Sequence, residues 1–186
     1  MAHDLLNSIA LLERTPGALD ALLRGLPDAW TRRNEGDGTF TVAEVLGHLI
    51  YADKKDWLPR TRKILSQQNS THATDELPVF DPFDRWGHIE ECRGKTLSGL
   101  LDEFARVRSD CIVDLRGLNL NTEQLSLRGR HPALGAVTLS ELLATWAAHD
   151  LTHLHQISRI MATQYGEEVG PFRAFLGVMK CNGHGG

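Results

Sequence analysis

The 186-residue sequence predicts an all-α protein, a four-helix bundle with one long crossover connection. Three observations support this fold class. Apolar residues recur three and four positions apart in four separate segments, which is the period of a helix that buries one face. Two of these segments begin with a Thr-x-x-Glu capping box, which marks the start of a helix. No stretch of useful length alternates apolar and polar residues as a strand does.

The first predicted helix extends from Leu5 to Leu23 and is interrupted at Pro16. Proline cannot donate the interior backbone hydrogen bond. The helix therefore either kinks at this point or restarts with Thr15 as its N-cap and Pro16 in its first turn. The glycine and proline in residues 25–27 end it.

The second predicted helix begins at the capping box formed by Thr41 and Glu44, and its apolar pattern continues to Ile64. We expect Pro59 to bend it. The segment Ser66–Trp86 that follows is rich in Asp, Pro and polar residues. Connections of this length in compact domains are usually functional or crossover segments, so we expect it to border a pocket.

The third predicted helix opens at Thr96, and Gly117 and Asn119 end it. The fourth begins at the capping box formed by Thr138 and Glu141 and runs to Met161. We expect residues 1–182 to form a single domain and residues 183–186 to be a flexible tail.

The composition excludes several classes of protein. A net charge of -4 provides no basic face for nucleic acid or for an anionic membrane. No apolar run approaches the roughly 20 residues that span a bilayer, and the N-terminus lacks a signal-peptide pattern. The three cysteines are scattered and form no CxxC pair. We therefore expect a cytoplasmic protein with neither nucleic acid nor membrane as a partner.

Two histidines on the fourth helix form a candidate metal site. His149 and His153 lie on the same stripe as Leu142, Trp146 and Ile157, and these apolar residues mark the stripe as buried. One helical turn is the spacing that lets two imidazoles reach one metal ion. The alternative is that each ring is a core histidine with its own hydrogen-bond partner. The pair alone leaves both interpretations open.

His48 is the candidate third ligand. It lies near the middle of the second helix, beside an apolar stripe, and His149 lies at a similar depth in the fourth. Three imidazoles leave coordination positions open for water or substrate, which is typical of a catalytic site. Asp150 and Gln156 could support the ligands or line the pocket. The expected apolar walls are Trp57, Trp86 and Trp146, although bundle core is the simpler role for Trp146.

The other histidines are weaker candidates. His155 is displaced by about 200° from His153 around the helix and is expected to face outward. The remaining five are expected in chain ends, in a turn or in solvated loops: His3, His72, His88, His131 and His184. Two known metal motifs fit poorly. His149 to His153 has Asp where the zincin motif HExxH has Glu, and the Glu-x-x-His pairs of di-iron bundles are absent.

Several segments together resemble the DinB/YfiT-like superfamily. They are residues 41–50, residues 131–139, Trp146–His153 with Gln156 and Ile157, and Gly170-Pro171-Phe172. The resemblance covers nearly the whole chain. It implies an up-up-down-down four-helix bundle, often dimeric, with a metal held by three histidines at the positions of His48, His149 and His153. Nickel or zinc would be the metal. Characterised relatives include transferases and isomerases that use bacillithiol, mycothiol or glutathione.

Two functions follow as hypotheses. The first is a metalloenzyme with a three-histidine site, a thiol-dependent S-transferase or isomerase that acts on a small molecule, functioning as a homodimer. The second is a non-enzymatic, stress-associated bundle that binds metal or a small ligand. No residue of the sequence identifies the thiol or the substrate.

Overall fold

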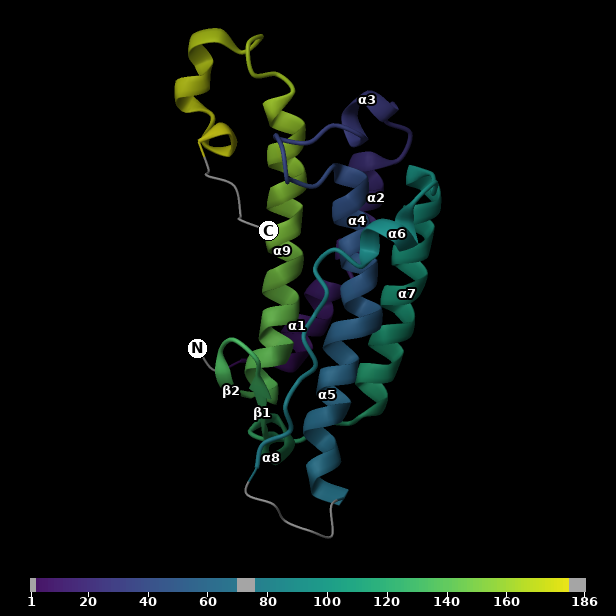
Figure 1. Ribbon diagram of the computed structural model, residues 1–186, viewed down its shortest axis with the longest axis vertical. Coiled ribbons are helices and arrows are strands. Elements are labelled where there is room, and N and C mark those ends of the chain that lie inside the picture. The colour runs from purple at the N-terminus through teal and green to yellow at the C-terminus, as the bar shows by residue number, and fades with distance from the viewer. Residues whose placement is uncertain (1–2, 70–75, 181–186) are drawn as a thin grey trace.

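The computed structural model describes residues 3–69 and 76–180, and most of them are helical (Figure 1). The helices are α1 (Leu5–Leu12), α2 (Thr15–Leu23), α3 (Asp28–Thr31), α4 (Val42–Ala52), α5 (Leu58–Leu65), α6 (His88–Cys92), α7 (Leu97–Gly117), α8 (Thr122–Leu125) and α9 (Leu139–Thr163). A π-helical turn, η1 (Asp53–Trp57), joins α4 to α5. The 3-10 turns are η2 (Ser66–Asn69), η3 (Gly170–Phe175) and η4 (Gly177–Met179), and the strands are β1 (Arg128–His131) and β2 (Gly135–Thr138). The expected tail, residues 183–186, lies outside the described residues.

Four helical segments form the bundle: α1 with α2, α4 continued through η1 into α5, α7, and α9 (Figure 1). Their apolar stripes meet in one core, in which residues such as Leu19, Leu46, Phe104 and Trp146 are completely buried. The predicted four-helix bundle is therefore confirmed. No helix within the described ranges is both long enough and apolar enough to cross a membrane.

Ion pairs between the helices define their directions. Lys54 pairs with Glu103 at 2.7 Å, and Arg62 pairs with Asp114 at 2.7 Å, so α4–α5 and α7 run the same way. The first and fourth segments run the opposite way (Figure 1). Two segments point in each direction, as an up-up-down-down bundle requires, but their order along the chain is up, down, down, up. The chain between α5 and α7 must consequently return along the bundle.

The first helix restarts near Pro16, as one of the two sequence alternatives predicts. The expected cap at Thr15 is wrong, because the N-cap position is Arg14, which keeps a helical backbone and makes no side-chain cap hydrogen bond. Its N–H donates to the carbonyl of Leu11 at 2.9 Å, so the chain turns without becoming extended. The hydroxyl of Thr15 donates instead to the carbonyl of Leu11 at 3.4 Å.

Both predicted capping boxes are confirmed. The amide of Thr41 donates to Glu44 at 2.7 Å, and the amide of Glu44 donates back to the Thr41 hydroxyl at 3.2 Å. Thr138 and Glu141 form the same reciprocal pair at 2.7 and 3.1 Å. Each such cap contributes about 1 kcal/mol, and together they fix where the two histidine-bearing helices begin.

The second helical segment is irregular one turn before the expected position. Pro59 lies in the first turn of α5, where its missing N–H is tolerated, and the irregularity is the π-helical turn η1. A π turn holds more residues than an α turn, which changes the faces that later residues present. Asp53, Asp56 and Trp57 in this turn are all buried.

A buried arginine connects the four segments. All five N–H groups of the Arg108 guanidinium are used: they donate to Asp53, to Asp150 and to the carbonyl of Leu12. Trp146 adds a hydrogen bond from its indole nitrogen to Asp53 at 3.0 Å. Burial alone would lower the pKa of Arg108, but the two carboxylates offset this effect and raise it. The guanidinium therefore stays charged in the core.

A β-hairpin was missed in the sequence. β1 and β2 pair antiparallel, and each is only four residues long, which is too short to show a clear alternation. The segment before α6 joins this hairpin, because the amide of Phe80 donates to the carbonyl of Arg130 at 2.9 Å. A side chain at Gly129 would meet the Phe80 ring at 2.5 Å, so a glycine is needed for this close approach. The contact holds part of the long connection against the bundle.

Substitution of Asp150 by Ala should destabilise the fold strongly, because it leaves the buried Arg108 with one carboxylate partner. We expect a loss of about 3–5 kcal/mol in the free energy of unfolding, measured by urea denaturation. The matched control is Asp110→Ala on α7, which removes an exposed pair with Arg106 and should cost less than about 1 kcal/mol. Equal losses in the two variants would contradict a structural role for the buried cluster.

Candidate metal centre

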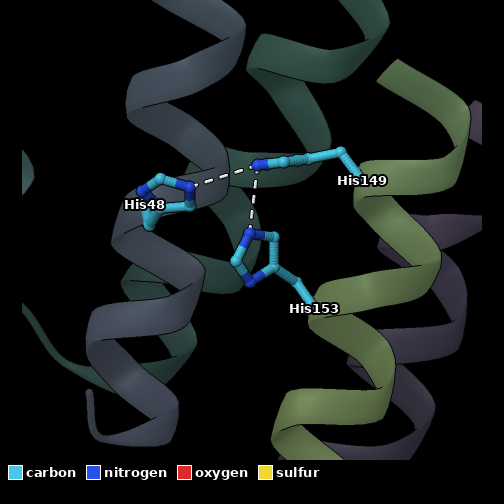
Figure 2. Close-up of side chains that lie close together, drawn as sticks. All are labelled: His48, His149 and His153. Atoms are coloured by element: carbon cyan, nitrogen blue, oxygen red, sulfur yellow. Dashed lines mark hydrogen bonds between the residues drawn. The ribbon is translucent and has the colours of Figure 1, made fainter. Parts of the chain in front are cut away.

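Three histidine side chains converge between α4 and α9. His48 extends from α4, and His149 and His153 extend from successive turns of α9 (Figure 2). The Nε2 atom of His149 lies 3.2 Å from that of His48 and 3.0 Å from that of His153. Ligand nitrogens about 2.1 Å from one tetrahedral ion lie about 3.4 Å apart, so the observed spacing is close to that of a three-histidine metal site. One ligand atom from each residue lies within 4.8 Å of the others.

Hydrogen bonds among the three rings cannot satisfy all of the nitrogen atoms that converge in this cluster. An imidazole nitrogen carries either one proton or one lone pair, so His149 Nε2 cannot form two full hydrogen bonds to its neighbours. Nδ1 of His153 donates to Oε1 of Gln156 at 2.7 Å, which leaves the lone pair of His153 on Nε2, directed at the cluster. A single cation can accept a lone pair from each of the three rings. The donor set therefore fits a divalent metal.

The site holds His48 and His149 in the neutral form. Burial, with a smaller contribution from the neighbouring His153, lowers the pKa of His48 to about 3 and that of His149 to about 2. Only a neutral imidazole offers a lone pair to a metal, so these rings are available as ligands at neutral pH.

Arg108 and its two partners, Asp53 and Asp150, fix the relative positions of the helices that carry the three histidines. Asp150 follows His149 directly, and Asp53 lies five residues after His48. Arg108 binds both carboxylates, so it holds α9 and the π turn at one level. The indole of Trp57 lies against the His149 ring, with 5.1 Å between ring centroids. The rings are consequently held by rigid helices rather than by a loop.

The three histidines open into a pocket with a volume of about 620 Å³. The rest of its wall comes from α4 to α5, α9, the hairpin and the segment before α6. The lining residues are Phe40, Ala52, Asp56, Trp57, Arg60, Phe80, Pro82, Phe83, Arg85, His131, Pro132, Leu134, Val137, Glu141, Leu142, Thr145, Thr152 and Gln156. The expectation that residues 66–86 border a pocket is thus confirmed for residues 80–85, whereas residues 70–75 lie outside the described residues.

An ion pair lies in the pocket wall beyond the histidines. Arg60 Nε is 2.6 Å from Asp56, and both side chains are about nine-tenths buried. Burial raises the pKa of Asp56 to about 6, although the charge of Arg60 opposes this shift. Asp56 lies eight residues after His48, which is about 12 Å along a helix. The pocket therefore extends well beyond the reach of the three histidines.

Gln156 and Asp150, the two residues expected to support the ligands, have different roles in the structure. Gln156 contacts His153 and lines the pocket. Asp150 is completely buried and pairs with Arg108, so it neither lines the pocket nor faces solvent. Of the tryptophans, Trp57 lines the pocket and Trp146 belongs to the core. Trp86 lies outside the pocket wall and packs edge-on against Phe40, with 5.1 Å between ring centroids.

His88 lies in a different environment from the one that the sequence predicts. A solvated loop position was expected, but His88 is completely buried at the start of α6. Its ring packs edge-on against His48, with 5.4 Å between centroids, and against Phe40 at 4.8 Å. The short helix α6 was not recognised, because its five residues carry no complete apolar period.

None of the other histidines that the structure describes belongs to the three-histidine cluster. His131 has the expected turn role, since its Nδ1 accepts the amides of Ala133 and Leu134 at 3.2 Å. His3 was expected in a frayed end, but it bonds to hydroxyls of Ser8 and Ser140 at 2.9 Å. His155 is not part of the three-histidine group. His72 and His184 lie outside the described residues.

The fold and the site together define a four-helix bundle with a three-histidine cluster at one end of a pocket. The chain belongs to the DinB superfamily, whose family model matches residues 11–157. The resemblance in the sequence is therefore confirmed. A search of curated proteins finds no match to the chain.

A solved structure of the same fold is that of YfiT from Bacillus subtilis. It matches with a TM-score of 0.69 and 21% sequence identity, covering 86% of this chain and 87% of that chain. YfiT is described as a probable metal-dependent hydrolase with an unusual four-helix bundle topology. At this level of identity the match shows the fold, and the activity of this chain must be argued from its own residues.

Gln156 should tune the metal affinity of this site. Substitution by Leu removes the acceptor of the His153 Nδ1 proton, so we expect zinc to bind about 10–100-fold more weakly in competition with a chromogenic chelator. Gln156→Glu keeps an acceptor and should retain tight binding. Equal affinity in the wild type and the Leu variant would show that this hydrogen bond does not support a ligand.

Proposed function

We propose that this protein is a metal-dependent enzyme in which His48, His149 and His153 bind one divalent cation. The observation that carries this proposal is the convergence of the three Nε2 atoms at a pocket wall. The cluster has three protein ligands, and a tetrahedral ion would keep a fourth position for a substrate or a nucleophile. A purely structural site would be closed by a fourth protein ligand.

Zinc or nickel suits the donor set best. Three neutral imidazoles form a nitrogen-only site of intermediate softness, which favours late divalent metals over the hard cations magnesium and calcium. The resemblance to the DinB/YfiT-like superfamily points to the same two metals. The description of YfiT as a probable metal-dependent hydrolase supports a metal at this site and names none.

The reaction we propose is attack by a metal-activated nucleophile on a small electrophile. A divalent cation on neutral imidazoles lowers the pKa of a bound water or thiol, so that either can act as a nucleophile near pH 7. With water as the nucleophile the protein would be a hydrolase, and YfiT is described as a probable metal-dependent hydrolase. A low-molecular-weight thiol would make it an S-transferase or isomerase, as in characterised members of the superfamily. The protein would work as a cytoplasmic homodimer, without nucleic acid or membrane as a partner.

The pocket supplies what such a reaction requires of the protein. Its wall is mainly apolar and aromatic, with Trp57, Phe83 and Leu142 among the lining residues, which limits the access of bulk water. The ligands come from two helices locked by buried ion pairs, so they are preorganised. A volume of about 620 Å³ is in the usual range for a small-molecule site.

Metal content tests the site directly. We expect one zinc or nickel ion per chain in wild-type protein after reconstitution and dialysis, measured by plasma mass spectrometry. His149→Ala removes the central ligand and should abolish stoichiometric binding. The matched control is His155→Ala, on the same helix but outside the three-histidine group, which should keep the metal. Metal content that is substoichiometric in the wild type and unchanged by His149→Ala would refute the site.

A substrate panel distinguishes the proposed reactions. Ester and amide hydrolysis should be assayed alone, and electrophilic substrates should be assayed with bacillithiol, mycothiol or glutathione. We expect at least one activity that a chelator abolishes and that added zinc or nickel restores. Activity without any thiol identifies a hydrolase, and strict thiol dependence identifies a transferase or isomerase. Inactivity across the panel with metal bound would instead favour a non-enzymatic binding protein.

A further inference from the structure

The two arginines in the pocket wall differ in their partners. Arg60 is engaged: its Nε pairs with Asp56 at 2.6 Å, and its guanidinium lies over the Phe80 ring, 5.2 Å from the centroid. Arg85 is exposed, and no salt bridge or side-chain hydrogen bond joins it to another residue that the structure describes. Its guanidinium is therefore available to a ligand.

Arg85 lies at the histidine end of the pocket. It lines the same cavity as the three histidines. Phe83, two residues before it in the chain, packs edge-on against the His48 ring, with 5.7 Å between ring centroids. The positive charge of Arg85 is consequently on the side of the pocket that holds the cluster.

The acidic groups of the pocket do not offset this charge. Asp56 is paired with Arg60. Glu141 accepts hydrogen bonds from the amide and hydroxyl of Thr138, where α9 begins, eight residues before His149. The two acids are thus engaged away from the histidines, and a bound divalent cation would add positive charge at the histidine end. The pocket favours an anion at that end.

The remaining wall favours an apolar body. Phe40, Trp57 and Phe83 lie near the histidines, and Leu142 and Val137 continue the apolar lining towards the hairpin. Aromatic and aliphatic walls of this kind stabilise a ligand through burial of its apolar surface. The positive charge and the apolar lining together suit a ligand that has an apolar body and one anionic end.

We propose that Arg85 is a substrate-binding residue that holds the carboxylate of an aromatic or aliphatic carboxylic acid at the histidine end of the pocket. This inference deepens the proposed function and rests on it, since the held acid would place its neighbouring atoms beside the metal. The planar guanidinium fork matches a carboxylate with two parallel hydrogen bonds. The apolar part of the acid occupies the pocket towards Leu142 and the hairpin.

The test compares two ligands that differ only in charge: 2-naphthoate and its neutral amide, 2-naphthamide. Their dissociation constants are measured by calorimetry with the full chain, both zinc-loaded and after removal of metal with EDTA. The variants are Arg85→Gln and the control Arg33→Gln, an exposed arginine outside the pocket wall. Arg85 is exposed and forms no ion pair with a residue that the structure describes, so its substitution should leave the fold intact, and naphthamide binding reports this directly.

We expect wild-type protein to bind 2-naphthoate more tightly than 2-naphthamide, and Arg85→Gln to weaken naphthoate binding about tenfold in both metal states. Naphthamide binding should not change, and Arg33→Gln should behave as wild type. The proposal is overturned if the wild type does not bind naphthoate, if Arg85→Gln leaves naphthoate binding unchanged, or if both ligands weaken equally. The metal-free arm makes this outcome independent of whether the three histidines bind a metal.

Discussion

The hydrogen-bonded cluster around Arg108 is the constraint on which the rest of the structure depends. Removing a guanidinium and two carboxylates from water is costly, and the cost is offset only when every donor finds an acceptor. Here all five N–H groups are satisfied by groups from α1, η1 and α9. Four helical segments that could slide along apolar stripes are thereby held in one register. We infer that the cluster defines the arrangement of the helices more than it adds to their stability.

The same cluster around Arg108 also fixes the positions of the histidines in the candidate metal centre. His149 is adjacent to Asp150, and His48 is close along the chain to Asp53, so the pairing of both carboxylates with Arg108 sets the two imidazoles opposite each other. Catalytic metal sites need ligands placed within a fraction of an ångström, which packed helices provide better than loops. The hairpin and residues 80–85 add the other walls of the pocket without bearing the ligands.

Much of the bundle and the three histidines could be predicted from the sequence, for definite physical reasons. Capping boxes at Thr41 and Thr138 are local signals, and the inward stripe of α9 follows from helical geometry. The roles of Asp150 and His88 could not be predicted, because each depends on a partner distant in sequence. Burial of Asp150 requires Arg108, and burial of His88 requires the return of the chain to α4. The hairpin and α6 are too short to carry a periodic signal.

The π turn at Asp53–Trp57 sets the faces that the second half of this helical segment presents. If the same five residues formed an ordinary α-helix, everything after them would rotate by about 100° around the axis. His48, which precedes the turn, would keep its place, whereas Arg60 would leave the pocket wall. The two halves of this segment serve different ends of the pocket, and the π turn fixes one relative to the other. Substitutions can alter the far wall gradually, but loss of the π turn would change it all at once.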